Sequence, residues 1–178
     1  MTALPLPLKE QNKNENVGSA SVKGIKNLEK GEYFAAIDSF NEAIEEEKNL
    51  ADSYRGLGIA LWETQDYQGA YDAMKTALEQ GTKENATIHS IMGNCSMQIE
   101  SYEKAAEHYE AALTMDDISE ELKKETIYNL IAAYEYAGNV DKAKEKLEEY
   151  IHYYNNERIS LKLKGMSPVQ YRAHSQAI

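Results

Sequence analysis

The sequence is poor in the residues that build disulfides, tight turns and membrane spans. Among its 178 residues there are one cysteine, Cys95, and three prolines. A single cysteine excludes an internal disulfide and any metal site built from several cysteines. We expect Cys95 to be a small buried apolar residue, with a reactive thiol as the alternative. No apolar run approaches the roughly 18 residues that a membrane span requires. The composition therefore indicates a globular chain that is long enough for one domain with a core.

Basic residues are scarce everywhere except near the end of the chain. Residues 20–155 hold 13 Lys and Arg against 27 Asp and Glu, a net charge of −14, whereas residues 156–178 hold four against one, a net charge of +3. An acidic body repels phosphate, so we expect no nucleic-acid partner, and neutral or basic peptides fit better. The first 18 residues lack a basic start and are broken by Pro5 and Pro7, unlike a secretory signal. We therefore expect a cytoplasmic protein without membrane association, in which residues 1–18 are disordered.

Side chains that could converge for catalysis or metal binding are also lacking. The four histidines lie far apart, and no two of them stand at the i, i+4 spacing of a helical zinc site; they are His89, His108, His152 and His174. We expect His89 to serve packing. The sequence contains no phosphate-binding glycine loop, nucleophile elbow or dinucleotide fingerprint. It therefore predicts that the protein is not an enzyme and needs no cofactor or metal.

The chain does contain a spacing pattern that recurs four times. Three copies start with a glycine and the fourth with an isoleucine, and further small or apolar residues follow 12, 16 and 19 positions later. The copies are Gly24, Ala36, Phe40 and Ala43; Gly58, Ala70, Met74 and Ala77; Gly93, Ala105, Tyr109 and Ala112; and a weaker set, Ile131, Ala143, Leu147 and Tyr150. The alanines at the second place are separated by 34, 35 and 38 residues. A near-constant period of this length is typical of a helical repeat protein.

Each copy holds two helical patterns with a short break between them. In the second copy, "YRGLGIALWE" (54–63) and "YQGAYDAMKTALEQ" (67–80) place apolar residues three and four positions apart. Asp66 stands where it would cap the second helix. The small Gly and Ala residues allow the two helices of a pair to approach closely, with the larger side chains packed against them. Helix ends are expected at Gly31, Gly81 and Gly138, and helix starts at Ser101 and Asn139.

This pattern resembles the tetratricopeptide repeat family over about residues 19–155. The resemblance implies an all-α fold, a right-handed solenoid of helix hairpins with about four repeats and a helical cap at its carboxyl end. The repeats are expected at about 19–50, 51–84, 85–118 and 119–155. The chain departs from the family in two ways. The proline that usually closes each unit is missing from all four, and Ile131 replaces the glycine of the fourth.

The resemblance also implies a concave groove, lined by the first helix of each hairpin, that binds a peptide or protein segment. The residues at matching positions are Arg55, Ile59, Trp62, Asn94, Met97, Tyr128, Asn129 and Tyr136. The two asparagines match residues that in the family often hydrogen-bond a peptide backbone, which suits an amide because it donates and accepts at once. Other roles stay open. Trp62 could lie in the core, Arg55 could pair with Asp52 or Glu63, and the asparagines could cap neighbouring turns.

The last part of the chain resembles a different family. From about Leu147, "LEEYIHYYNNERISLKLKGMSPVQYRAHS" is similar to the carboxyl end of bacterial insertion-sequence transposases with an integrase core, especially through "YYNNERI" and "GMSPVQYR". Those enzymes hold two metal ions with three carboxylates, none of which falls in this segment, so no catalytic role is implied here. We expect residues 156–178 to be an extension that caps the solenoid, with a disordered remnant or a nucleic-acid contact as the alternatives. A short helix is expected at 168–174, with Ser167 as its N-cap.

The sequence thus predicts a non-catalytic scaffold that binds a protein or peptide partner in its groove. Two alternatives remain. The tyrosine-rich carboxyl end could pair with another copy to form a homo-oligomer, or the chain could be a DNA-associated remnant of a transposase.

Overall fold

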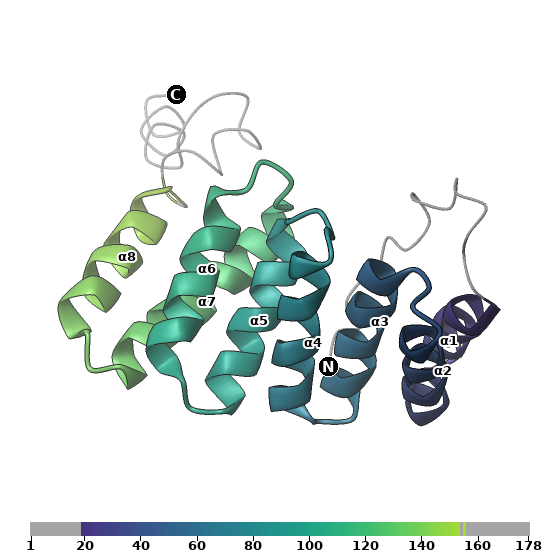
Figure 1. The fold of residues 1–178 in the computed structure, drawn as a ribbon. Helices are drawn as coiled ribbons and strands as arrows, with labels where there is room; N and C mark the ends of the chain where they lie inside the picture. Colours follow the sequence, from purple (N-terminus) through teal and green to yellow (C-terminus); the bar gives the residue numbers. More distant parts are fainter. Residues whose placement is uncertain (1–18, 154, 156–178) are drawn as a thin grey trace, which may run out of the picture.

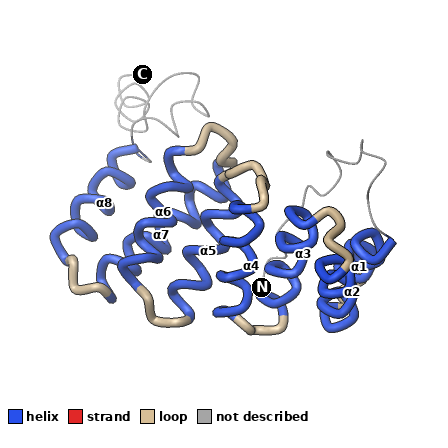
Figure 2. The backbone as a smooth tube through the Cα atoms, in the orientation of Figure 1, coloured by secondary structure: helices blue, strands red, loops and turns tan. Residues whose placement is uncertain are grey.

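The computed structural model describes residues 19–153 and 155, and these residues form helices and loops without a strand (Figure 1, Figure 2). The helices are α1 (Ser19–Glu29), α2 (Tyr33–Glu45), α3 (Leu50–Glu63), α4 (Tyr67–Glu79), α5 (Ala86–Gln98), α6 (Tyr102–Thr114), α7 (Glu120–Tyr136) and α8 (Val140–Tyr153). Consecutive helices pair into hairpins, and Figure 1 shows the hairpins in chain order along one row, from α1 and α2 at one end to α8 at the other. The predicted all-α solenoid of helix hairpins is confirmed.

The expected helix ends follow from local backbone and side-chain chemistry. The Asp66 carboxylate accepts a hydrogen bond of 3.0 Å from the Gly69 backbone N–H at the start of α4. The three predicted terminating glycines all have the positive φ angles that favour glycine: Gly31 at 75°, Gly81 at 94° and Gly138 at 77°. Ser101 stands at the N-cap of α6 as expected, although its side chain makes no capping bond. Polar and glycine punctuation therefore sets most hairpin turns.

Small residues create the close helix contacts within the hairpins. Ala36, Ala70 and Ala105 are all 0% exposed. A Cβ atom added to Gly93 would lie 2.5 Å from the Tyr109 ring, which shows how tightly α5 and α6 approach. The predicted nesting of large side chains against these small ones is confirmed.

The sequence pattern did not predict the contacts between successive hairpins. The Phe40 ring of α2 packs against Gly24 of its own hairpin and also against Gly56 of α3, where an added Cβ would lie 2.3 Å from the ring. Hydroxyl pairs join successive first helices, Ser21 to Ser53 at 3.3 Å and Ser90 to Thr126 at 3.2 Å. Each of the first three hairpins is therefore covered by the next one along the chain.

The fourth hairpin, α7 and α8, leaves more of its apolar surface exposed than the others do. Leu147 takes the place that Phe40, Met74 and Tyr109 hold in the inner hairpins. Those three side chains are at most 1% exposed, but Leu147 is 44% exposed. No fifth hairpin follows among the described residues, so the outer side of this hairpin lacks the cover that the others have.

Several predictions lie outside the described residues. They are the disorder of residues 1–18, the cap formed by residues 156–178, and the short helix at 168–174 with Ser167 as its N-cap.

Candidate functional site

The predicted groove residues of α3 contact neighbouring side chains of the solenoid itself. The Arg55 guanidinium pairs with the Asp52 carboxylate at 2.8 Å, the first of the two pairings that the sequence left open, and the Arg55 side chain is only 20% exposed. Ile59 is 7% exposed and belongs to the hydrophobic core cluster that α1, α2, α3, α4 and α5 share. Trp62 packs against the same core, with its ring centroid 5.1 Å from that of Tyr67. Their role in a groove stays a prediction.

The two predicted asparagines lie side by side. The Asn129 amide of α7 donates a hydrogen bond of 3.2 Å to the Asn94 carbonyl oxygen of α5, and the Tyr109 hydroxyl donates a second one of 2.6 Å to the same oxygen. Burial raises the pKa of Tyr109, so its hydroxyl stays protonated and donates. Neither asparagine caps a turn. Within residues 19–153 and 155, the Asn94 Nδ2 and the Asn129 carbonyl oxygen have no partner, and both side chains are partly exposed.

The other predicted residues differ widely in exposure. Met97 is partly buried against a second hydrophobic core cluster, which α6, α7 and α8 share. Tyr128 is 75% exposed and Tyr136 is 68% exposed, and the Tyr136 ring stacks on Tyr102 at 5.2 Å between centroids. The structure therefore brings together Asn94, Asn129 and their neighbours on α5 and α7, while the α3 residues contact a separate part of the core.

A chain of polar contacts joins two histidines that the sequence analysis placed far apart, and that prediction is wrong. Nδ1 of His89 lies 3.2 Å from Nδ1 of His108, Nε2 of His108 lies 3.1 Å from the Tyr71 hydroxyl, and Nε2 of His89 lies 2.6 Å from the Glu84 carboxylate. No spacing rule signals this cluster, because its members come from α4, α5, α6 and the loop after α4. The expected packing role of His89 holds only in part: the ring is buried, but both of its nitrogens have polar partners.

With both rings neutral, one set of proton positions satisfies every contact in this chain. The Tyr71 hydroxyl donates to His108, the His108 Nδ1–H donates to His89, and the His89 Nε2–H donates to Glu84. Burial, followed by the charges of His89 and Lys104, lowers the pKa of His108 to about 4. The cluster therefore acts as a structural link between the second and third hairpins at neutral pH.

Cys95 is fully buried within the core, as expected. Burial raises the pKa of its thiol to about 12, so the nucleophilic thiolate is rare at neutral pH. Among the described residues, no three His, Cys, Asp or Glu side chains are placed to hold a metal ion. No helix formed by these residues has both the length and the apolar character that crossing a bilayer would take.

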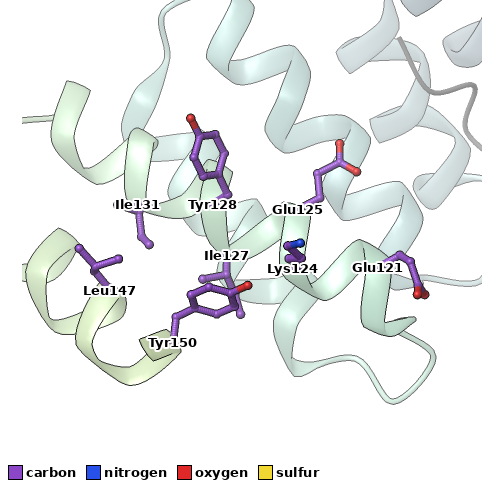
Figure 3. Close-up of a pocket in the computed structure, with 8 residues that line it drawn as sticks. All are labelled: Glu121, Lys124, Glu125, Ile127, Tyr128, Ile131, Leu147 and Tyr150. Atoms are coloured by element: carbon purple, nitrogen blue, oxygen red, sulfur yellow. The ribbon is translucent and has the colours of Figure 1, made fainter. Parts of the chain in front are cut away.

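A groove runs between α7 and α8 at the end of the row of hairpins (Figure 3). Its cavity volume is about 390 Å³, and its lining residues are Glu121, Lys124, Glu125, Ile127, Tyr128, Ile131, Leu147 and Tyr150. Apolar side chains from both helices form its floor, and the charged residues of α7 stand along one side. Sequence reasoning did not identify this groove, because it results from the position of α8 relative to α7.

Stacked helix hairpins with a polar surface on their first helices define a helical-repeat protein of the kind that serves as a protein-interaction scaffold. The tetratricopeptide repeat model matches residues 24–85 and 55–119, which together make up more than half of the chain. The chain therefore belongs to the tetratricopeptide repeat family.

Solved structures show the same fold at low sequence identity. The crystal structure of MamA matches with a TM-score of 0.64 and 22% identity, over 80% of this chain and 74% of that one. The structure of YrrB, described as a TPR protein with an unusual peptide-binding site, matches with a TM-score of 0.52 and 19% identity, over 80% of this chain and 89% of that one. Both matches cover a larger share of the chain than the repeat model does.

The second resemblance is also confirmed. An integrase core domain model matches residues 120–175. A protein assigned as transposase InsK for insertion sequence element IS150 of Escherichia coli is 54% identical over 35 residues, and an uncharacterized transposase-like protein of Haemophilus influenzae is 57% identical over 35 residues. Each match covers 20% of this chain but only 12% and 16% of the two relatives, so the chain spans a small part of their length.

The two family matches meet at a structural boundary. The repeat match ends at residue 119 and the integrase match begins at residue 120, where α7 starts. The integrase match thus begins well before Leu147, where the sequence alone showed the resemblance. It includes both helices of the fourth hairpin, which nevertheless packs on α6 much as the inner hairpins pack on each other.

Proposed function

We propose that the protein is a non-catalytic scaffold that binds an extended peptide or protein segment along its first helices, at the surface formed by α5 and α7. The observation that carries this proposal is the paired amides of Asn94 and Asn129. Each amide keeps one hydrogen-bonding group without a partner among the described residues, a donor on Asn94 and an acceptor on Asn129. A peptide backbone offers the matching acceptor and donor on every residue.

The surroundings of the amide pair support the same reading. The Tyr109 hydroxyl holds the Asn94 carbonyl in place, so the free N–H₂ group is oriented before any partner binds. The net charge of −14 on residues 20–155 favours a neutral or basic segment.

The variant Asn94→Asp tests the proposal while sparing the fold. The aspartate keeps an oxygen for the Tyr109 and Asn129 donors but replaces the free donor with an acceptor. An array of immobilised random-sequence peptides, probed with the full chain, should show binding that Asn94→Asp weakens about tenfold or more, since one hydrogen bond to a charged or oriented group contributes about 1.5 kcal/mol.

The matched control is Asn41→Asp on α2, an exposed asparagine that receives the same charge change. It should leave peptide binding unchanged. Equal binding by the unmodified chain and Asn94→Asp would remove the amide pair from the proposed site, and a chain that binds no peptide on the array would overturn the proposed function.

A further inference from the structure

The groove between α7 and α8 lies where a further hairpin would pack if the row of repeats continued. Tyr128 stands three residues before Ile131, just as Ser21 and Ser90 stand three residues before Gly24 and Gly93. Those serines are 0% and 4% exposed because the next first helix covers them, whereas Tyr128 is 75% exposed.

The second helix of the hairpin shows the same contrast. Leu147 is 44% exposed, although its counterparts in the inner hairpins are buried, and Ile151 one turn further along α8 is 49% exposed. An apolar surface of this kind on both helices is costly in water, at about 25 cal/mol for each Å² left uncovered. The inner hairpins are covered by the chain that follows them, so the chain that follows α8 is the first candidate for this place.

We propose that residues 159–164 of the same chain occupy this groove. The sequence there is "ISLKLK", in which Ile159, Leu161 and Leu163 alternate with polar residues. In an extended segment, alternate side chains point to opposite faces, so the three apolar side chains share one face and the two lysines share the other. The apolar face of the segment thus matches the apolar floor of the groove, and the lysine face stays in water.

The lengths also agree. Six extended residues span about 20 Å, and the stretch of α7 from Glu121 to Ile131 that lines the groove is about 15 Å long. The chain leaves α8 beside the groove, because the Tyr153 hydroxyl donates a hydrogen bond of 3.1 Å to the Glu120 carboxylate at the start of α7. From residue 155, four extended residues reach about 13 Å, which is sufficient to enter it.

The positive charge of residues 156–178 also favours residues 159–164 as the occupant of the groove over an acidic surface. Residues 156–178 carry a net charge of +3, and the charged residues that line the groove are Glu121, Glu125 and Lys124, so the lining has an excess of one negative charge. The attraction of the two glutamates for Lys162 and Lys164 favours a position of the segment next to α7, with both lysines in water at the rim of the groove. The integrase core match, residues 120–175, includes both helices of the groove and the proposed occupant, so all three parts fall within one matched unit.

Limited trypsin digestion of the full chain, followed by mass spectrometry, tests the proposal. Cleavage after Lys162 and Lys164 should be at least about tenfold slower than in a synthetic peptide of residues 156–178. The variant Leu147→Asp places a charge on the groove floor and should return cleavage toward the rate of the peptide. The matched control is Phe34→Asp, which changes a 76% exposed apolar residue of α2 and should leave the rate unchanged.

A second variant keeps the test informative if Leu147→Asp disturbs the hairpin. The double reversal Glu121→Lys and Glu125→Lys touches only exposed side chains and should also speed cleavage after the two lysines. Its control is Asp38→Lys with Glu42→Lys, an exposed pair of the same i, i+4 spacing on α2. Circular dichroism of each variant confirms that the helices are intact.

Three results would overturn the proposal. The first is cleavage as fast as that of the free peptide. The second is protection that neither groove variant reduces. The third is protection that grows with protein concentration, because the occupant would then be the segment of a second copy. None of these results bears on the peptide array, which reports on the separate surface around Asn94.

Discussion

The Nδ1 atoms of His89 and His108 face each other across 3.2 Å, although the two residues belong to different helices. Two ring nitrogens can share a hydrogen bond only if one of them carries a proton and the other does not. Protonation of His108 would place a positive charge on this half-buried ring, which burial disfavours. The link between the second and third hairpins therefore depends on pH.

Acid should weaken the fold through His108. Its pKa is lowered from 6.5 to about 4 in the folded chain, so between these values the unfolded chain binds more protons and stability falls as the pH falls. We expect a contribution of roughly 1 to 3 kcal/mol, after allowing for screening by solvent at this half-buried site. Urea unfolding at pH 7 and pH 4.5 should show a smaller loss of stability for His108→Gln than for the unmodified chain.

The control for this experiment is His152→Gln, which removes an exposed histidine of α8. Its loss of stability between the two pH values should equal that of the unmodified chain. An equal loss for His108→Gln would show that the histidine contact does not set the acid sensitivity.

Gly56 should tolerate a methyl group less well than Gly58, although both lie in α3. A Cβ at position 56 would stand 2.3 Å from the Phe40 ring, whereas a Cβ at position 58 would meet the flexible Met74 side chain at 3.0 Å and the Ala70 carbonyl oxygen at 3.2 Å. Alanine gains about 0.5 to 1 kcal/mol of helix propensity at either position, but overpacking against a rigid ring costs about 1 to 3 kcal/mol. Chemical denaturation should rank Gly56→Ala below Gly58→Ala in stability, and the reverse order would contradict the role of Phe40 as the link between hairpins.

The Tyr134 hydroxyl should stabilise the joint between α6 and α7, where the two family matches meet. It donates a hydrogen bond to the Glu110 carboxylate, and burial together with this bond raises its pKa. Tyr134→Phe should lower the free energy of unfolding by about 0.5 to 1.5 kcal/mol. Tyr136→Phe is the matched control, because its ring is 68% exposed, and it should be neutral in the same thermal or urea melts. If the two variants have equal effects on stability, the hydrogen bond from Tyr134 to Glu110 does not stabilise the contact between α6 and α7.

Much of the fold could be predicted because it depends on local chemistry. Gly31, Gly81 and Gly138 end their helices through positive φ angles, which glycine adopts at the lowest cost, and Asp66 caps α4 with its own side chain. The recurring glycines and alanines set how closely paired helices approach. The helix ends and caps involve residues within one or two turns, and the close helix contacts recur at a fixed spacing within each hairpin, so the order of residues along the chain is sufficient to reveal them.

The sequence by itself thus determined the helices, their pairing and the family to which they belong. Only the tertiary structure decided that Phe40 reaches Gly56 in the next hairpin, that His89 meets His108, and that Leu147 is left beside an open groove. These relationships depend on the distance and angle between helices, which result from the packing of many side chains at once. A periodic pattern records which face of a helix is apolar, but it does not record which distant side chain meets that face.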